Sequence, residues 1–338
     1  MPITPIFEKK NVLVIGGAGF IGSHLCDSLI KTNKVICLDN FISGSEINID
    51  HLLRFPDFEF IKHDITEPIN LEKFPELEKF NVRFQGVQEI YNLACPTSPR
   101  DFEKYRIETI FTNSYGTRNA LDLAVKYKAK FLHFSSSVVY GGRIKENFFY
   151  KEDYIGVVDP LSPRSCYDEG KRFAESLVAN YRSVYNIDAK IARIFRTYGS
   201  RMKLGEGHMM PDFIINALDN KDLVIYGDET FSSSFCYVSD IVDGVIRLMK
   251  TSPEVYLINL GSPRVYKIVD VAKEIIKMTS SQSKIVFHAP LLFMTPLGLP
   301  DITQAREKLG WIPVVTLKSG LEKFIDYAKA HKEIKGFV

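Results

Sequence analysis

Tyr167 and Lys171 are the residues whose types and spacing most directly suggest chemistry. They stand four residues apart in a helical pattern, so their side chains are predicted to share one face and point into the same cleft. A phenol with its usual pKa of about 10 is a poor base. A neighbouring positive charge lowers that pKa. A tyrosine tuned in this way can accept a proton from a substrate hydroxyl.

Ser136 would complete this candidate catalytic set. It lies within a run of three serines at the end of an apolar segment, where its hydroxyl would orient the substrate oxygen beside Tyr167. The competing interpretation is a tyrosine and a lysine on an ordinary amphipathic helix, which is a common chance pairing. The choice between the two depends on which elements position these side chains.

A glycine-rich turn near the N-terminus would place a nucleotide beside them. The aliphatic run 12–15 is typical of a strand buried on both faces of a parallel sheet. Gly17, Gly19 and Gly22 follow, and the pattern becomes helical from Ser23. A strand, a glycine turn and a helix in this order place free amides and the helix dipole against a diphosphate.

Asp39 adds the second part of a dinucleotide signature. It ends the predicted strand 34–38, where a carboxylate can accept both ribose hydroxyls of NAD and repel the extra phosphate of NADP. The alternative is a glycine-rich turn followed by a surface aspartate. Strand, turn, helix, strand and acid all agree, and we therefore predict NAD as the cofactor.

The hydrophobic pattern alternates between strands and helices over the first part of the chain. Strands are predicted at 12–15, 34–38, 58–62, 87–93, 131–134 and 189–194, and long helices at 102–127 and 166–185. Beyond Phe195 the alternation weakens, with strands predicted at 223–226, 256–259 and 285–288 and helices at 212–218, 240–249, 268–278 and 317–330.

This pattern predicts an α/β fold. We expect a doubly wound parallel Rossmann sheet in an NAD-binding domain over 1–195. A smaller C-terminal α+β lobe over 196–338 would mainly bind substrate beyond the carboxyl ends of the strands. In this scheme, strand elements near 230–260 are allowed to return to the Rossmann sheet.

Composition narrows the classes of function. The 338 residues are 45% hydrophobic and 25% charged, as in soluble globular proteins. A net charge of +2 indicates no nucleic-acid or membrane partner. Met1–Lys10 has no apolar core typical of a secretory leader, which favours a cytoplasmic location. The histidines and the five scattered cysteines lack metal-ligand spacing, so no metal site is predicted.

Several motifs together resemble extended short-chain dehydrogenase/reductases, the NAD-dependent epimerase/dehydratase family. They lie at 16–25, 94–99, 163–172, 192–195, 237–240 and 309–313. Within that family the chain looks most similar to UDP-glucuronate decarboxylases (UDP-xylose synthases). The resemblance implies tightly held NAD that oxidises a sugar at C4 and then returns the hydride. It also implies a nucleotide-sugar substrate, with a UDP-sugar favoured, and a homodimer built from helices of the Rossmann lobe.

The resemblance further implies a set of binding residues. Those for the cofactor are Gly16, Gly19, Phe20, Ile21, Gly22, Asp39, Asn40, Asp64, Ile65 and Leu93, with Tyr167 and Lys171. Those for the substrate are Ser98, Asn113, Ser137, Arg196, Arg201, Met210 and Phe213. Asp64 would lie against adenine and Arg201 would reach the diphosphate, although a surface aspartate and a solvated loop arginine are the simpler interpretations.

Four positions depart from the decarboxylase pattern. Val138 stands in place of a glutamate, Ser233 in place of an arginine, Glu108 in place of a lysine and Arg196 in place of an asparagine. Loss of an arginine and a lysine would weaken pairing with a uronate carboxylate. If Glu108 lined the pocket, it would repel that carboxylate. A misaligned loop that hides a compensating arginine is the alternative.

Val138 also excludes the acid that a 4,6-dehydratase needs for the leaving water. The sequence therefore favours a nucleotide-sugar 4-epimerase on a decarboxylase-like frame. The first alternative is a UDP-glucuronate decarboxylase. The second is a protein that binds NAD and a nucleotide sugar without turnover.

Overall fold

The protein is described by a computed structural model over residues 9–143, 148–289 and 297–336. Most of Met1–Lys10, the segment used for the leader prediction, lies outside the described residues. No helix in the described part of the chain is both long and apolar enough to cross a membrane.

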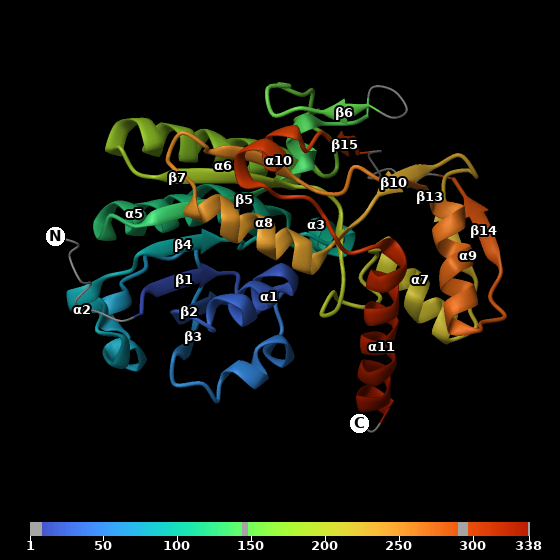
Figure 1. Cartoon of the computed structure of the whole chain (residues 1–338), viewed down its shortest axis with the longest axis horizontal. Coiled ribbons are helices and arrows are strands. Elements are labelled where there is room, and N and C mark those ends of the chain that lie inside the picture. The colour runs from blue at the N-terminus through green and yellow to red at the C-terminus, as the bar shows by residue number, and fades with distance from the viewer. Residues whose placement is uncertain (1–8, 144–147, 290–296, 337–338) are drawn as a thin grey trace.

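A seven-stranded parallel sheet forms the larger lobe (Figure 1). Its strands are β1 (Asn11–Ile15), β2 (Lys34–Asp39), β3 (Phe58–Lys62), β4 (Glu89–Asn92), β5 (Lys130–Ser136), β7 (Ala189–Ile194) and β12 (Leu257–Leu260). They are ordered β12-β7-β5-β4-β1-β2-β3. The chain progresses outward in opposite directions on the two sides of β1, so a crevice forms where β1 and β4 end.

Helices cover both faces of this sheet because its strands are apolar on both faces. On one face, α1 (Phe20–Leu29) and α8 (Val238–Lys250) contact each other and pack on Val12 and Val14. On the other, α5 (Thr117–Tyr127) and α6 (Ser165–Tyr185) pack on Leu13 and Ile15. The predicted doubly wound Rossmann fold is confirmed.

The smaller lobe lies beyond the carboxyl ends of the strands (Figure 1). Its helices are α7 (Met209–Leu218), α9 (Ile268–Thr279) and α11 (Leu317–Gly336). Its short strands pair as β9 (Leu223–Tyr226) with β14 (Ile285–His288), and β10 (Ser232–Ser234) with β13 (Val265–Lys267). At the junction of the lobes, β8 (Thr197–Tyr198) pairs with β11 (Cys236–Tyr237), and β6 (Phe149–Tyr150) pairs with β15 (Leu299–Pro300) before α10 (Thr303–Leu309).

One predicted strand returns to the larger lobe and one predicted helix is divided. The strand predicted at 256–259 is β12, which joins the Rossmann sheet beside β7, as the sequence allowed for elements near 230–260. The long helix predicted over 102–127 is instead α3 (Pro99–Lys104), α4 (Arg106–Phe111), a turn of π-helix (Thr112–Gly116) and α5. The short helix α2 (Val82–Gln85) precedes β4. The boundary at 195 between the two domains stays a prediction.

Local hydrogen bonds explain why the long helix is interrupted. Ser98 and Asp101 form a capping box, which fixes the start of α3 three residues before the predicted helix. Tyr105 then leaves helical geometry with ψ at +43°. The segments bury different faces: Phe102 of α3 packs with Tyr167, Ile107 of α4 is exposed, and Leu121 of α5 packs in the core beneath the sheet.

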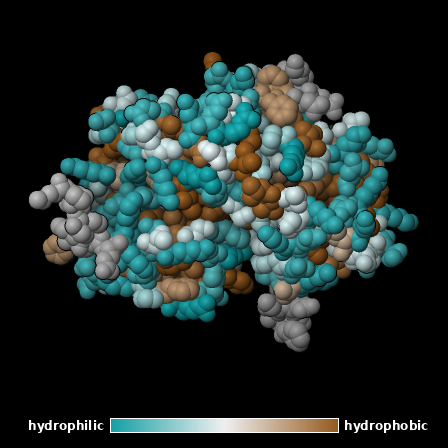
Figure 2. Space-filling model, in the orientation of Figure 1, coloured by the Kyte–Doolittle hydropathy of each residue, from teal (hydrophilic) through white to brown (hydrophobic). Residues whose placement is uncertain are grey.

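Hydrophilic residues cover most of the face shown in Figure 2, and hydrophobic residues gather toward its middle. Helix α11 follows this division. Its Leu321, Phe324 and Ile325 are buried in the core of the smaller lobe, while Glu322 and Lys323 are exposed. The helix is therefore a packed element rather than a fully solvated one.

Candidate active site

A cavity of about 740 Å³ lies between the two lobes. It brings together most of the residues that the sequence singles out. Those that line it are Gly16, Gly19, Phe20, Ile21, Gly22, Asp39, Asn40, Ile65, Leu93, Ser98, Ser136, Ser137, Tyr167, Lys171, Arg196, Arg201, Met210 and Phe213. Asp64 and Asn113 do not line it.

The glycine turn is shaped to admit an anion close to the backbone. Gly16 has φ of +80°, and a Cβ there would come within 2.7 Å of the amide nitrogen of Ala94. A Cβ on Gly22 would lie 2.2 Å from the carbonyl oxygen of Gly16. Helix α1 begins with no side-chain cap and no acidic residue in its first turn. Its first amides therefore remain available to a diphosphate, and the turn fits NAD.

Asp39 is held at the end of β2 by the same turn. One carboxylate oxygen accepts a hydrogen bond from the amide of Ala18 (3.0 Å) and the other from the amide of Phe41 (2.8 Å). Burial raises the pKa of Asp39, while these amides and the nearby Lys203 act in the opposite direction. The carboxylate lines the cavity, where the remaining lone pairs can accept ribose hydroxyls.

Asp64 holds the side chain of Asn40, which lines the cavity, and does not line the cavity itself. Its carboxylate accepts a hydrogen bond from the Asn40 side-chain amide (2.9 Å) and two from Thr66. Burial acts to raise the pKa of Asp64, but these hydrogen bonds outweigh it and the pKa is lowered. Asp64, for which a contact with adenine is predicted, does not line the cavity, whereas the neighbouring residue Ile65 does.

The candidate catalytic residues meet at the carboxyl end of β5. Tyr167 lies in the first turn of α6, and its ring stacks on Phe102 with 4.9 Å between ring centroids. The hydroxyls of Tyr167 and Ser136 share a hydrogen bond. Lys171 donates from Nζ to the carbonyl oxygen of Phe134 (2.8 Å), and this nitrogen lies 6.0 Å from the centroid of the Tyr167 ring. All three side chains line the cavity.

Taken together, the protein's own groups raise the pKa of Tyr167. This corrects the prediction that the spacing to Lys171 lowers it. Burial is the largest effect and raises this pKa, and Cys95 adds to it. The hydrogen bond from Ser136 and the charge of Arg164 act in the opposite direction. Burial also lowers the pKa of Lys171, whose ammonium is directed to a backbone carbonyl rather than to the phenol. The nicotinamide ring of bound NAD⁺ would add a positive charge that does not belong to the protein.

Two predicted substrate residues make other contacts. Asn113 is buried behind the cavity and donates to Cys95 Sγ (3.1 Å) and to the carbonyl oxygen of Thr109 (2.8 Å). Arg201 lines the cavity, but it forms an ion pair with Asp27 (2.7 Å). The diphosphate contact predicted for Arg201 therefore competes with a partner inside the protein.

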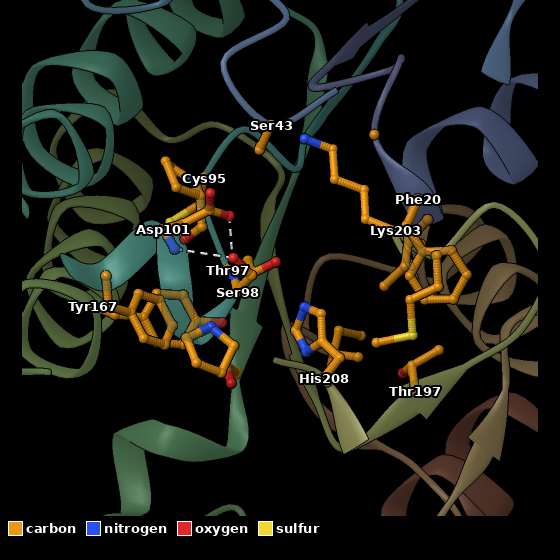
Figure 3. Close-up of a pocket in the computed structure, with 18 of the residues that line it drawn as sticks. Phe20, Ser43, Cys95, Thr97, Ser98, Asp101, Tyr167, Thr197, Lys203 and His208 are labelled. Atoms are coloured by element: carbon orange, nitrogen blue, oxygen red, sulfur yellow. Dashed lines mark hydrogen bonds between the residues drawn. The ribbon is translucent and has the colours of Figure 1, made fainter. Parts of the chain in front are cut away.

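Sequence reasoning missed several residues that line the cavity. Figure 3 shows Asp101 and Tyr167 on one side, with Lys203 and His208 across from them. Burial lowers the pKa of His208 to about 4, so this imidazole is neutral at pH 7. The segment 94–99 carried a signal, since it belongs to the family resemblance. The loop around 203–208 carried none, because its pattern is that of an ordinary polar connection.

The positions that depart from the decarboxylase pattern differ in their surroundings. Val138 lines the cavity, is only 2% exposed and packs with Tyr167 and Phe102. Ser233 is buried in β10. Glu108 is exposed on α4 and does not line the cavity, so the expected repulsion of a substrate carboxylate does not arise.

Comparison with known proteins agrees with this geometry. The sequence model of the NAD dependent epimerase/dehydratase family matches residues 12–261. UDP-glucuronic acid decarboxylase 4 of Arabidopsis thaliana is 42% identical over 321 residues, which cover 94% of this chain and 69% of that protein. UDP-glucuronic acid decarboxylase 1 of Danio rerio is 39% identical over 324 residues, covering 95% of this chain and 73% of that protein.

Solved structures of the same kind superpose over nearly the whole chain. UDP-glucuronic acid 4-epimerase from Bacillus cereus, solved with UDP-glucuronic acid and NAD, has a TM-score of 0.81 at 29% identity and covers 95% of this chain and 99% of that one. UDP-glucose 4-epimerase from Thermotoga maritima, solved with UDP-glucose, has a TM-score of 0.81 at 26% identity with the same coverage. This chain is thus an NAD-dependent enzyme that belongs to the NAD dependent epimerase/dehydratase family.

Proposed function

We propose that the protein oxidises UDP-glucuronate at C4 and releases the sugar carboxylate as carbon dioxide. The observation that carries this proposal is the meeting of Tyr167 and Ser136 with the glycine turn in one cavity. The relatives at 42% and 39% identity are UDP-glucuronic acid decarboxylases, which favours this reaction over the 4-epimerase that the sequence favoured.

The chain's own residues would handle the proton at O4. NAD, when bound, supplies the acceptor for the hydride that leaves C4. Ser136 would orient the sugar O4, and Tyr167 would remove its proton as the hydride departs. Lys171 would contribute a positive charge within the same cleft while its ammonium stays anchored to the Phe134 carbonyl.

Carbon dioxide loss then needs little further help from side chains. With a ketone at C4, the carboxylate on C5 is that of a β-keto acid. The electrons of the breaking carbon–carbon bond pass to the C4 oxygen. The hydroxyls of Ser136 and Tyr167 would stabilise the enolate by hydrogen bonds. A proton added at C5 and reduction at C4 complete the product, and no carboxylic acid at position 138 is required.

The nucleotide would extend toward the smaller lobe. Met210 and Phe213 of α7 line the cavity there, and their side chains are otherwise buried. An apolar wall of this kind suits the face of a base. We keep uracil as the proposed base. The cytoplasmic location and the homodimer also stay predictions.

A nucleotide-sugar 4-epimerase is the second candidate. Val138 is the observation for it, because this cavity residue departs from the glutamate of the decarboxylase pattern and epimerisation needs no acid there. In that reaction the C4 ketone would rotate in the cavity and be reduced on its other face. A protein that binds NAD and a nucleotide sugar without turnover is the third candidate.

Incubation of the NAD-loaded protein with UDP-glucuronate separates the three. We expect labelled carbon dioxide from carboxyl-labelled substrate and, by mass spectrometry, a nucleotide sugar that has lost one carbon dioxide. An isomer of unchanged mass with a new chromatographic position would instead establish the epimerase. Retained NAD without product from any of a panel of nucleotide sugars would support the binding protein.

A further inference from the structure

Arg196 occupies a place in the cavity that the proposed reaction has not yet used. It directly precedes β8, and its carbonyl oxygen accepts a hydrogen bond from the amide of Cys236 in β11 (3.0 Å). This pairing sets its side chain beside Phe235, with the guanidinium carbon 5.8 Å from the ring centroid. Both residues line the cavity.

The surroundings of Arg196 are positively charged. Burial, together with the charges of Arg164 and Arg143, lowers its pKa to about 10, so the guanidinium is still charged at pH 7. The charge of Arg196 also acts to lower the pKa of His208, which is neutral at pH 7. Among the described residues, the charged groups that shift the pKa of Arg196 are both arginines, and none is acidic.

Its two positive neighbours already have partners within the protein. Arg164 forms an ion pair with Asp168 (3.1 Å). Arg143 donates to the carbonyl oxygens of Ser232 and Leu297 (both 2.9 Å). Within the described ranges, no ion pair joins Arg196 to a carboxylate. Arg196 is half-buried, and a charge partly removed from water is stabilised by pairing, so this position favours an anion from outside the chain.

Arg196 also lies at the reacting end of the cavity. Two residues before it, Ile194 pairs with Ser136 in the β5–β7 register, so Arg196 follows the strand end next to the candidate catalytic serine. The substrate carbon beside Tyr167 would be C4, and the carboxylate of a uronate is carried by the next ring carbon. The anion nearest to Arg196 would therefore be this carboxylate rather than the diphosphate.

Strand pairing relates Arg196 to the arginine that the family resemblance places at position 233. Phe231 and Phe235 both line the cavity. Ser233 lies midway between them in the sequence, and every second residue of an extended chain shares a face. Its side chain is too short to reach a ligand. Arg196 directly precedes Thr197, which pairs with Cys236 in the β8–β11 pair, so its side chain lies beside Phe235, two residues after Ser233.

We infer that Arg196 binds the carboxylate of the uronate sugar and thereby selects acidic over neutral sugar nucleotides. This inference rests on the substrate class of the proposed function. A guanidinium can hold a carboxylate through two parallel hydrogen bonds. The contact would orient C5 beside Tyr167, and the carboxylate would become the partner that Arg196 lacks.

The test compares two ligands that differ at one carbon. UDP-glucuronate and UDP-glucose share the base, ribose and diphosphate, but only the first has the carboxylate. Calorimetry on NAD-loaded protein carrying Tyr167→Phe throughout, so that UDP-glucuronate binds without being consumed, would give both dissociation constants. For Arg196→Gln we expect UDP-glucuronate to bind about 10- to 100-fold more weakly, with less than about a threefold change for UDP-glucose. Arg196→Lys should retain part of the preference because it keeps the charge.

Arg143→Gln is the matched control. It removes a positive charge from the same neighbourhood but not a side chain that lines the cavity, so the ratio of the two affinities should stay as in the wild type. An equal loss for both ligands in Arg196→Gln would overturn the inference, since it would indicate a diphosphate contact or a structural role. If Arg143→Gln changed the affinity ratio as much as Arg196→Gln, the inference would also be overturned. The summed positive charge of the neighbourhood would then account for the preference.

The inference and the proposed function fail in different ways. If the wild type prefers UDP-glucuronate through Arg196 but yields neither carbon dioxide nor an isomer, the inference stands and the function is wrong. If carbon dioxide is released and Arg196→Gln leaves the affinity ratio unchanged, the function stands and the inference is wrong.

Discussion

Replacement of Tyr167 by phenylalanine removes one hydroxyl and leaves the ring in place. The stack on Phe102, with its centroid separation of 4.9 Å, and the approach of Lys171 to the ring at 6.0 Å do not involve the oxygen. Folding should lose only the hydrogen bond with Ser136, about 1 kcal/mol. The chemical step should lose its proton acceptor, which lowers kcat about 100- to 10,000-fold. That loss corresponds to about 3–5 kcal/mol of activation free energy.

The assay is product formation from UDP-glucuronate by the NAD-loaded variant, followed by mass spectrometry. NAD content and the melting temperature, measured on the same preparation, report on folding. Tyr181→Phe is the matched control, because Tyr181 lies on the same helix and its hydroxyl donates to Asp122 (2.7 Å) outside the cavity. Tyr181→Phe should keep wild-type turnover. If Tyr167→Phe kept more than about a tenth of wild-type kcat, the assignment of Tyr167 as the base would be refuted.

Four further outcomes follow from single features of the structure. Gly22→Ala should purify with much less NAD, seen as lost absorbance of the bound cofactor, because the new Cβ would lie 2.2 Å from a backbone oxygen of the glycine turn. Burial raises the pKa of Tyr167, and the base is its deprotonated form, so kcat should rise with pH between about 7 and 9 in a pH–rate profile. Ile107 is 59% exposed on α4, and Ile107→Glu should shift the expected homodimer to a monomer in sedimentation. Ser233→Arg in an Arg196→Ser background should restore the preference for UDP-glucuronate over UDP-glucose, measured by calorimetry.

The Rossmann sheet could be predicted because its strands are continuous apolar runs bounded by turns. The strand predicted at 189–194 is β7 without a change of boundary, and the strand predicted at 34–38 gains only Asp39. Hydrophobic periodicity could not assign a strand to one lobe where tertiary contacts decide between the two. β12 is a short apolar segment of a type that suits either lobe, and its pairing with β7 places it in the Rossmann sheet.

The candidate site could be predicted as far as motifs with a local mechanism reach. The glycine turn, Asp39 and the pair of Tyr167 and Lys171 each follow from spacing along one element, and all of them line the cavity. The pKa of Tyr167 could not be predicted in this way. Its direction depends on burial against Phe102, a residue of another helix, and this burial outweighs the charge expected from one turn of α6.

Substrate recognition shows why positions cannot be judged one at a time. Read singly, Ser233 and Glu108 suggest a site that has lost its affinity for a carboxylate. In the fold, Glu108 is exposed and outside the cavity, so it carries no weight against an acidic sugar. Ser233 and Arg196 are distant in sequence, yet the β8–β11 pair places Arg196 beside Phe235, two residues after Ser233. The loss of a cation at one position and the gain of a cation at the other then amount to a relocation of positive charge. A uronate substrate would fit this arrangement better than a neutral sugar, because its carboxylate would pair with Arg196, which forms no ion pair with a carboxylate in the part of the chain that the structure describes.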